Sequence, residues 1–309
     1  MTPHSFAPDA VGTGEFVRPD SRFRDVVTAD GSSGFPAAAA RYHLYVARAC
    51  PWAHRTLIVR RLKGLEEAVT VSFAHPFRDE RGWAFPGGDH VDDVNGYGLL
   101  SEAYERTDPS YDGRVSVPVL WDRVSGRIVN NESADIIRML NGEFDAVAED
   151  PDVDLYPEDL RGEIDAINER VYADVNNGVY RAGFARTQEA YDAAFDRLFA
   201  ALDWLEGLLG ERRYLAGDRI TEADWRLFTT LARFDAVYYV HFRCNGRRLV
   251  DYPNLWGFAR ELFQQPGIAE TLDLAEVKEH YYTTHDELNP KHIVPKGPFL
   301  DWNSPHGRG

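Results

Sequence analysis

The chain has 309 residues, of which 44% are hydrophobic, 13% aromatic and 27% charged, so it is neither disordered, collagen-like nor a coiled coil. Its 50 acidic residues outnumber 34 basic ones, and the formal net charge of -16 would repel a phosphate backbone, so we expect no nucleic-acid partner. No stretch approaches the ~20 consecutive apolar residues that cross a bilayer, and Met1 to Ala10 lack the basic and apolar regions of a leader. Two cysteines are too few for a disulfide framework. Together these features favour a cytoplasmic protein with no membrane partner.

The first half of the chain mixes strand and helix patterns. Residues 1–40 are rich in Pro, Gly, Asp and Ser, which predicts an irregular extension. Helical patterns open at Cys50 and at Glu132, and a long irregular insertion is expected at about 75–112. Four short runs have strand composition: 42–46, 69–74, 117–121 and 127–129. This order predicts an α/β domain over residues 41–145.

The second half has a helical period. Residues 146–158 are acidic and contain prolines, which predicts an interdomain linker. Beyond them, apolar residues recur three and four apart, so we expect an all-helical domain at 159–309 that ends in an irregular, proline-bearing tail. Thr221 and Asp224 precede an apolar run and predict a capping box, in which the carboxylate reaches back to the Thr221 amide.

Cys50 is the residue that most directly suggests chemistry. It follows a predicted strand, and Pro51 occupies the first helical position, where its missing amide hydrogen costs nothing. The sulfur then lies at the positive end of a helix, where a thiolate is stabilised and nucleophilic at neutral pH. The alternative is that Cys50 is a small buried hydrophobe, which this setting disfavours. Cys244 has no comparable setting, and we expect it to be structural or incidental.

The residues after Cys50 limit what its thiol can do. Ala53 stands where a dithiol oxidoreductase carries its second cysteine, so a mixed disulfide at Cys50 must be resolved by an external thiol. A small-molecule thiol cosubstrate follows from this chemistry. His54 either supports the thiolate as an imidazolium or has a packing or capping role, and the sequence leaves both open. No cluster of His, Cys and carboxylate has ligand spacing, so no metal is expected.

Several segments resemble a known family. Residues 42–53, 117–122 and 129–133 resemble the thioredoxin-like domain of cytosolic glutathione transferases. Motifs spread over the whole chain narrow the resemblance to the xi class, the glutathionyl-hydroquinone reductases: Cys50-Pro51-Trp52-Ala53-His54-Arg55, Gly82-Trp83-Ala84-Phe85, Asn130-Asn131-Glu132-Ser133, Asn176-Asn177-Gly178-Val179-Tyr180 and His280-Tyr281-Tyr282. The resemblance implies an α/β thioredoxin-like N-terminal domain plus an all-α C-terminal domain, glutathione or another γ-glutamyl thiol as cosubstrate, and a homodimer.

The same resemblance implies roles for residues of the thiol site. Pro118 would be in the cis form and would expose the Val117 backbone to the cysteinyl part of the thiol. Glu132 and Ser133 would hold the γ-glutamyl group, with a plain helix cap as the alternative for both. Trp83 would close over the thiol, or else pack beneath the insertion.

Tyrosines of the helical half are expected to bind the quinol. The resemblance implies this role for Tyr180, Tyr281 and Tyr282, and Tyr172 is a further candidate, with core packing as the alternative for each. In the expected reaction the Cys50 thiolate attacks the sulfur of a glutathionyl-hydroquinone. Tyr180 or Tyr281 protonates the departing ring carbon, directly or through its hydroxyl contacts. A second glutathione then resolves the mixed disulfide and releases glutathione disulfide. The alternatives are a broader thioltransferase or dehydroascorbate reductase, and a non-catalytic binding protein on the same scaffold.

Overall fold

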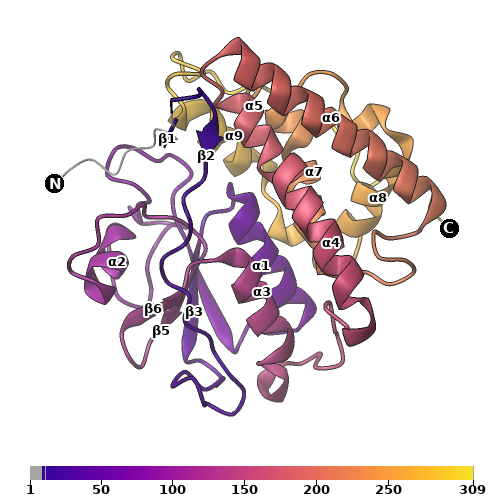
Figure 1. The fold of residues 1–309 in the computed structure, drawn as a ribbon. Helices are drawn as coiled ribbons and strands as arrows, with labels where there is room; N and C mark the ends of the chain where they lie inside the picture. The colour runs from indigo at the N-terminus through magenta and orange to yellow at the C-terminus, as the bar shows by residue number, and fades with distance from the viewer. Residues whose placement is uncertain (1–8, 11, 309) are drawn as a thin grey trace. The chain divides into compact units, whose positions relative to one another are not determined.

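The computed structural model describes residues 9–10 and 12–308; most of the segment Met1 to Ala10, in which we expect no leader, lies outside the described residues, as do Val11 and Gly309. The chain divides into two compact units, whose elements are labelled in Figure 1. Among the described residues, unit 1 comprises 20–154 and 271–280, and unit 2 comprises 9–10, 12–19, 155–270 and 281–308.

A four-stranded sheet, in the order β4-β3-β5-β6, forms the centre of unit 1. Its strands are β3 (Tyr42–Val46), β4 (Val69–Phe73), β5 (Val119–Asp122) and β6 (Arg127–Asn130). β3 is parallel to β4 and antiparallel to β5, which is antiparallel to β6. Helix α1 (Pro51–Leu62) connects the parallel pair and packs against α3 (Ser133–Gly142). All five residues of β3 are buried, as expected of a central strand covered on both faces. This topology confirms the predicted thioredoxin-like domain.

Two predicted elements of unit 1 differ in detail. The insertion at 75–112 is not irregular throughout, because it contains helix α2 (Ser101–Thr107), which buries Tyr104. Seven residues are too few to display a helical period in the sequence. The strand predicted from residue 117 begins two residues later, since Pro118 has no amide hydrogen to donate to the sheet.

Apart from the short pair β1–β2, unit 2 is helical, which confirms the all-α fold predicted for the second half of the chain. Helix α4 (Arg161–Val171) continues into the π-helical turn η3 (Tyr172–Asn176), and α7 (Glu222–Arg233) continues into the π-helical turn η4 (Phe234–Tyr238). Residues 274–280 of α9 belong to unit 1 and residues 281–284 to unit 2. The remaining bounds are β1 (Asp9–Ala10), β2 (Phe16–Val17), η1 (Asp145–Val147), η2 (Glu158–Leu160), α5 (Gly178–Gly183), α6 (Gln188–Glu211), η5 (Leu249–Asp251), α8 (Pro253–Phe263), η6 (Ala269–Thr271) and α9 (Leu274–Thr284).

The capping box predicted at the start of α7 is present. The Thr221 amide donates to Asp224 Oδ2 at 2.7 Å, and the Leu215 amide donates to Asp224 Oδ1 at 2.9 Å. Asp224 is fully buried, and this burial raises the pKa of its carboxyl to about 6, against the opposing effect of the amides.

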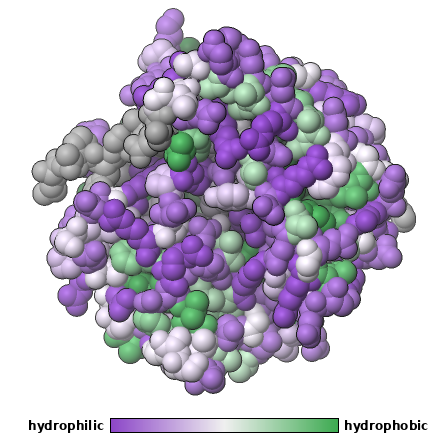
Figure 2. Space-filling view, viewed as in Figure 1, coloured by the Kyte–Doolittle hydropathy of each residue, from purple (hydrophilic) through white to green (hydrophobic). Residues whose placement is uncertain are grey.

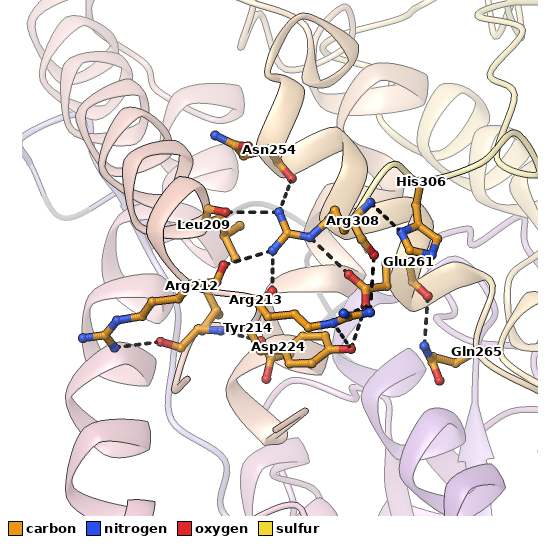
Figure 3. Close-up of polar contacts among 11 residues, drawn as sticks. Leu209, Arg212, Arg213, Tyr214, Asp224, Asn254, Glu261, Gln265, His306 and Arg308 are labelled. Atoms are coloured by element: carbon orange, nitrogen blue, oxygen red, sulfur yellow. Dashed lines mark hydrogen bonds and ion pairs between the residues drawn. The ribbon is translucent and has the colours of Figure 1, made fainter. Parts of the chain in front are cut away.

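The tail beyond α9 is attached to α6 and α8 within unit 2 (Figure 3). The Arg308 guanidinium donates to Glu261 Oε2 at 3.1 Å and to the carbonyl oxygens of Leu209 and Arg212, at 3.2 and 3.1 Å. Glu261 is 2% exposed and also accepts from Arg213 at 2.7 Å. The tail therefore completes a buried ionic cluster that satisfies carbonyl groups at the end of α6.

Polar residues predominate on the face drawn in Figure 2, and the apolar ones form small separate areas. Within the described ranges, no helix has both the length and the apolar composition needed to span a membrane.

Candidate active site

Cys50 lies at the start of α1 in unit 1, where its position follows from the local sequence. Its backbone is extended, with φ -78° and ψ 120°, and Pro51 opens the helix behind it. The thiol is free and half-buried. It donates to the Val117 carbonyl oxygen, with the sulfur 3.6 Å from that oxygen. The Val117–Pro118 peptide bond is cis, as the resemblance implied. The structure thus places a thiol at a helix N-terminus, a position that suits a sulfur nucleophile, while the Val117 carbonyl accepts from the neutral thiol.

Glu132 and Ser133 both lie at the N-terminus of α3. Glu132 Oε1 accepts from the Ala134 amide at 3.1 Å, and its Oε2 accepts from Ser21 Oγ at 3.0 Å. Ser133 is 3% exposed, and its hydroxyl accepts from Arg55 at 3.5 Å. Glu132 therefore caps the helix, while a γ-glutamyl-binding role for the pair stays a prediction.

Trp83 is buried within the insertion, with 4% of its surface exposed. Its ring stacks on the imidazole of His280, at a centroid distance of 5.0 Å and an interplanar angle of 19°. His280 is held by a 2.7 Å contact between its Nδ1 and the Pro76 carbonyl oxygen. The guanidinium carbon of Arg78 lies 5.2 Å from the centroid of the Trp83 ring. Trp83 therefore packs within unit 1, and its role toward a bound thiol stays a prediction.

His54, which follows Cys50 closely in the sequence, and Cys244, the second cysteine, both have structural partners. His54 is fully buried on α1, and its Nε2 lies 2.8 Å from Thr271 Oγ1, so its contacts favour the packing role. Cys244 is also fully buried, and burial raises the pKa of its thiol well above the ordinary range. Its sulfur lies 3.7 Å from the Phe242 carbonyl oxygen. A thiol in this state is a poor nucleophile.

Three tyrosine hydroxyls meet in unit 2. The hydroxyls of Tyr180 and Tyr281 are 2.6 Å apart, and Tyr238 Oη lies 3.2 Å from Tyr281 Oη. Tyr281 is 2% exposed, and burial raises the pKa of both Tyr281 and Tyr238 well above the ordinary value. The raised pKa keeps the hydroxyls of Tyr281 and Tyr238 protonated, and the three hydroxyls form one hydrogen-bonded chain. Tyr238 was not singled out in the sequence, because nothing there distinguishes it from the other core tyrosines.

The other two predicted tyrosines have different surroundings. Tyr282 is 4% exposed, its ring packs 4.7 Å from that of His241, and its hydroxyl donates to the Ala236 carbonyl oxygen at 3.4 Å. Tyr172 is 40% exposed, on the π-helical turn η3. Tyr180 and Tyr281 are thus brought together, whereas the Tyr282 hydroxyl points to the backbone.

No group of three or more His, Cys, Asp or Glu side chains that could hold a metal ion occurs in the part of the chain that the structure describes.

A thioredoxin-like unit with a cysteine at its first helix, together with a helical second unit, defines the fold of the cytosolic glutathione transferases. Residues 49–143 match the family described as glutathione S-transferase, N-terminal domain, and residues 188–261 match its C-terminal domain.

Curated proteins and solved structures are similar over nearly the whole chain. Glutathionyl-hydroquinone reductase PcpF of Sphingobium chlorophenolicum is 53% identical over 92% of this chain and 90% of its own. The glutathione-bound structure of YqjG from Escherichia coli K-12 has a TM-score of 0.91 and 50% identity, covering 93% of this chain and 96% of that one. A xi-class transferase from Natrialba magadii also has a TM-score of 0.91, with 51% identity, covering 93% and 88%. The chain therefore belongs to the xi class of glutathione transferases.

Proposed function

We propose that this chain reduces glutathionyl-hydroquinones to hydroquinones, with Cys50 as the nucleophile and glutathione as the reductant. The observation that carries this proposal is the free, half-buried Cys50 thiol at the N-terminus of α1, beside the Val117 carbonyl. The similarity to a protein named glutathionyl-hydroquinone reductase, 53% identical over 92% of this chain, supports the choice of substrate.

The reaction consists of two exchanges at sulfur. In the first, the Cys50 thiolate attacks the glutathionyl sulfur, so a sulfur–sulfur bond forms while the bond from sulfur to the ring carbon breaks. The electron pair of the broken bond goes to the ring carbon, which takes up a proton. In the second, the thiolate of another glutathione attacks the mixed disulfide, which releases glutathione disulfide and restores the Cys50 thiolate.

The other residues are assigned by what each could contact. Val117 would pair with the cysteinyl backbone of glutathione, and Trp83 would lie against it. Glu132 would attract the γ-glutamyl ammonium, and Ser133, with the amide at the start of α3, would bind the carboxylate.

The tyrosines of unit 2 are assigned to the aromatic part of the substrate. In this proposal the hydroxyl pair of Tyr180 and Tyr281 supplies the proton to the ring carbon, because the two hydroxyls are hydrogen-bonded to each other at 2.6 Å. Tyr172 and Tyr282 would contact the quinol ring.

The test is hydroquinone release from glutathionyl-menadiol with excess glutathione. We expect Cys50→Ala to abolish release, while Cys244→Ala, at the buried second thiol, keeps it. Tyr180→Phe should lower kcat about tenfold or more and leave glutathionylation of Cys50 by glutathione disulfide, which needs no proton on a ring carbon, unchanged. Release that persists in Cys50→Ala would refute the proposal. No release from a folded wild-type chain whose Cys50 still forms a mixed disulfide would instead support the thioltransferase alternative.

We further propose that the protein acts as a cytoplasmic homodimer and uses a thiol with a γ-glutamyl group. Light scattering of the purified chain tests the dimer, and a monomer mass would refute it. Affinities measured for glutathione, γ-glutamylcysteine and a sugar-based thiol test the cosubstrate. Preference for the sugar-based thiol would refute the roles of Glu132 and Ser133.

A further inference from the structure

The N-terminal extension contains a short segment, residues 21–25, that lies beside the start of α3 within unit 1. The Phe23 amide donates to Asn131 Oδ1 at 3.1 Å, and the Asn131 amide donates to the Phe23 carbonyl oxygen at 3.0 Å. Further contacts join the two parts of the chain: the Arg24–Asn130 bridge, the Arg24–Asp135 ion pair and the hydrogen bond from Asn130 to the Asp25 carbonyl oxygen. These contacts fix the segment 21–25 against the residues that precede Glu132.

Ser21 begins this segment and reaches the Glu132 side chain. Its Oγ is 3.0 Å from Glu132 Oε2 and 3.2 Å from the Asn131 carbonyl oxygen. A hydroxyl has one hydrogen to donate, and a carboxylate is the stronger acceptor because it carries a charge. The Ser21 hydroxyl therefore donates to Glu132. Neither the sequence motifs nor the reaction above gives this hydroxyl a role.

The hydrogen bonds of Glu132 leave one part of its carboxylate available. An ionised carboxylate has about four acceptor positions, two on each oxygen. On Oε1, the Ala134 amide donates at 3.1 Å and the Ser133 hydroxyl at 3.4 Å. On Oε2, Ser21 is the one donor from the part of the chain that the structure describes. The remaining acceptor position is thus on Oε2, next to the Ser21 hydroxyl.

We propose that Ser21 is a positioning residue that acts through Glu132: by holding Oε2, it sets the direction of the acceptor position that receives the ammonium group of the γ-glutamyl thiol. A carboxylate that is already oriented binds such a donor at a lower entropic cost. This inference rests on the proposed function, because it takes Glu132 as the residue that attracts the ammonium. It goes beyond that function by extending the thiol site to a residue 111 positions away in the sequence.

The experiment compares glutathione with glutaryl-cysteinylglycine, the same tripeptide without its α-amino group. Both thiols keep the carboxylate of the γ-glutamyl group, so the difference between their dissociation constants reports on the ammonium. Calorimetry under reducing conditions gives the two constants for the wild-type chain and for Ser21→Ala. One hydrogen bond of ordinary strength changes an equilibrium constant by about fivefold. We therefore expect S21A to bind glutathione about fivefold more weakly and to bind the analogue within about twofold of wild type.

Matched variants separate the hydroxyl from the packing of the extension. Ser33→Ala removes another hydroxyl of the extension, which accepts from the Phe35 amide at 3.2 Å, and it should leave both dissociation constants unchanged. Ser21→Thr keeps the hydroxyl, and Ser21→Val has nearly the same shape without it, so only S21V should repeat the effect of S21A. This pair gives the same comparison if S21A does not fold. A role limited to holding the extension in place would weaken the binding of both thiols by the same factor, which would overturn the inference.

Glu132→Gln distinguishes this inference from the proposed function. In E132Q the charge that attracts the ammonium is absent, so the preference for glutathione over the analogue should fall further than in S21A. A wild-type chain that binds both thiols equally well would overturn the role of Glu132 in the proposed function, and the inference with it. A preference that is lost in E132Q but unchanged in S21A and S21V would overturn the role of Ser21 alone.

Discussion

The buried ammonium of Lys63 offers the sharpest test of how unit 1 is held together. Lys63 follows the last residue of α1 and is fully buried. Its Nζ donates to Asp145 Oδ1 at 2.7 Å and to the carbonyl oxygens of Pro151 and Val153, both at 2.9 Å. One side chain thereby attaches residues 145–153 to the end of α1. Lys63→Met removes the three donors and keeps the apolar stem.

The expected loss of stability in K63M depends on how each acceptor of the Lys63 hydrogen bonds is solvated without the ammonium. Asp145 is 50% exposed on its side chain, so its carboxylate returns to water at little cost. The two carbonyl oxygens each lose a bond to a charged donor, worth about 1.5 kcal/mol at the low end of the usual range. We therefore expect the free energy of unfolding to fall by about 3 kcal/mol in K63M. Lys63→Ala also removes buried methylene groups and should lose about 2 kcal/mol more.

The assay is urea unfolding followed by circular dichroism, with limited proteolysis of the segment 145–153 as a local measure. Lys291→Met makes the same chemical change at an exposed position and should stay within about 0.5 kcal/mol of wild type. Cleavage within the segment should accelerate in K63M and not in K291M. A K63M chain as stable as K291M, with unchanged cleavage, would refute the assignment of stability to the ammonium.

Three other predictions address titration and the tail. In the native chain iodoacetamide should label Cys50 and not Cys244, whose burial raises its pKa, and a mass spectrum showing equal labelling of both would contradict this. Because the folded pKa of Asp224 is raised from 3.8 to about 6, its contribution to stability is present below the unfolded value and is lost as the pH rises through about 6. Relative to wild type, the free energy of unfolding of Asp224→Asn should therefore rise by up to about 3 kcal/mol over that pH range. A difference between the two proteins that does not change with pH in urea unfolding would argue against the shift. Arg308→Ala should lower the free energy of unfolding by about 3 kcal/mol, because it removes a cation that pairs with the Glu261 carboxylate, which is 2% exposed. Unchanged urea unfolding would show that the other partners of Glu261 are sufficient.

Features that depend on neighbouring residues could be predicted from the sequence. The position of Cys50 before α1 follows from a strand pattern and Pro51, and both signals lie within ten residues. The capping box of Thr221 and Asp224 is local in the same way, and its hydrogen bonds confirm the prediction. The cis form of Pro118 came from the resemblance, because the residues around it carry no signal for it.

The features that were missed depend on distant parts of the chain. Pro76 and His280, whose contact supports the stacking on Trp83, are separated by 204 residues. Arg78 lies within a run of charged residues that reads as solvated surface, and its burial is decided by the packing of the insertion. Tyr238 resembles the other core tyrosines in the sequence, and only its contact with Tyr281, 43 residues away, distinguishes it.

Unit 1 is made of two segments that lie far apart in the sequence, and this constrains how the chain folds. Residues 271–280 supply Thr271 to His54, Glu276 to Arg48 and His280 to Trp83. The ribosome makes this segment only after residues 155–270, so the sheet and α1 emerge well before the partners of these side chains exist. Contacts over such long separations form slowly, and unit 1 acquires its final packing late in synthesis. Until then Trp83 lacks its stacking partner, and the nascent unit exposes more apolar surface than the finished one.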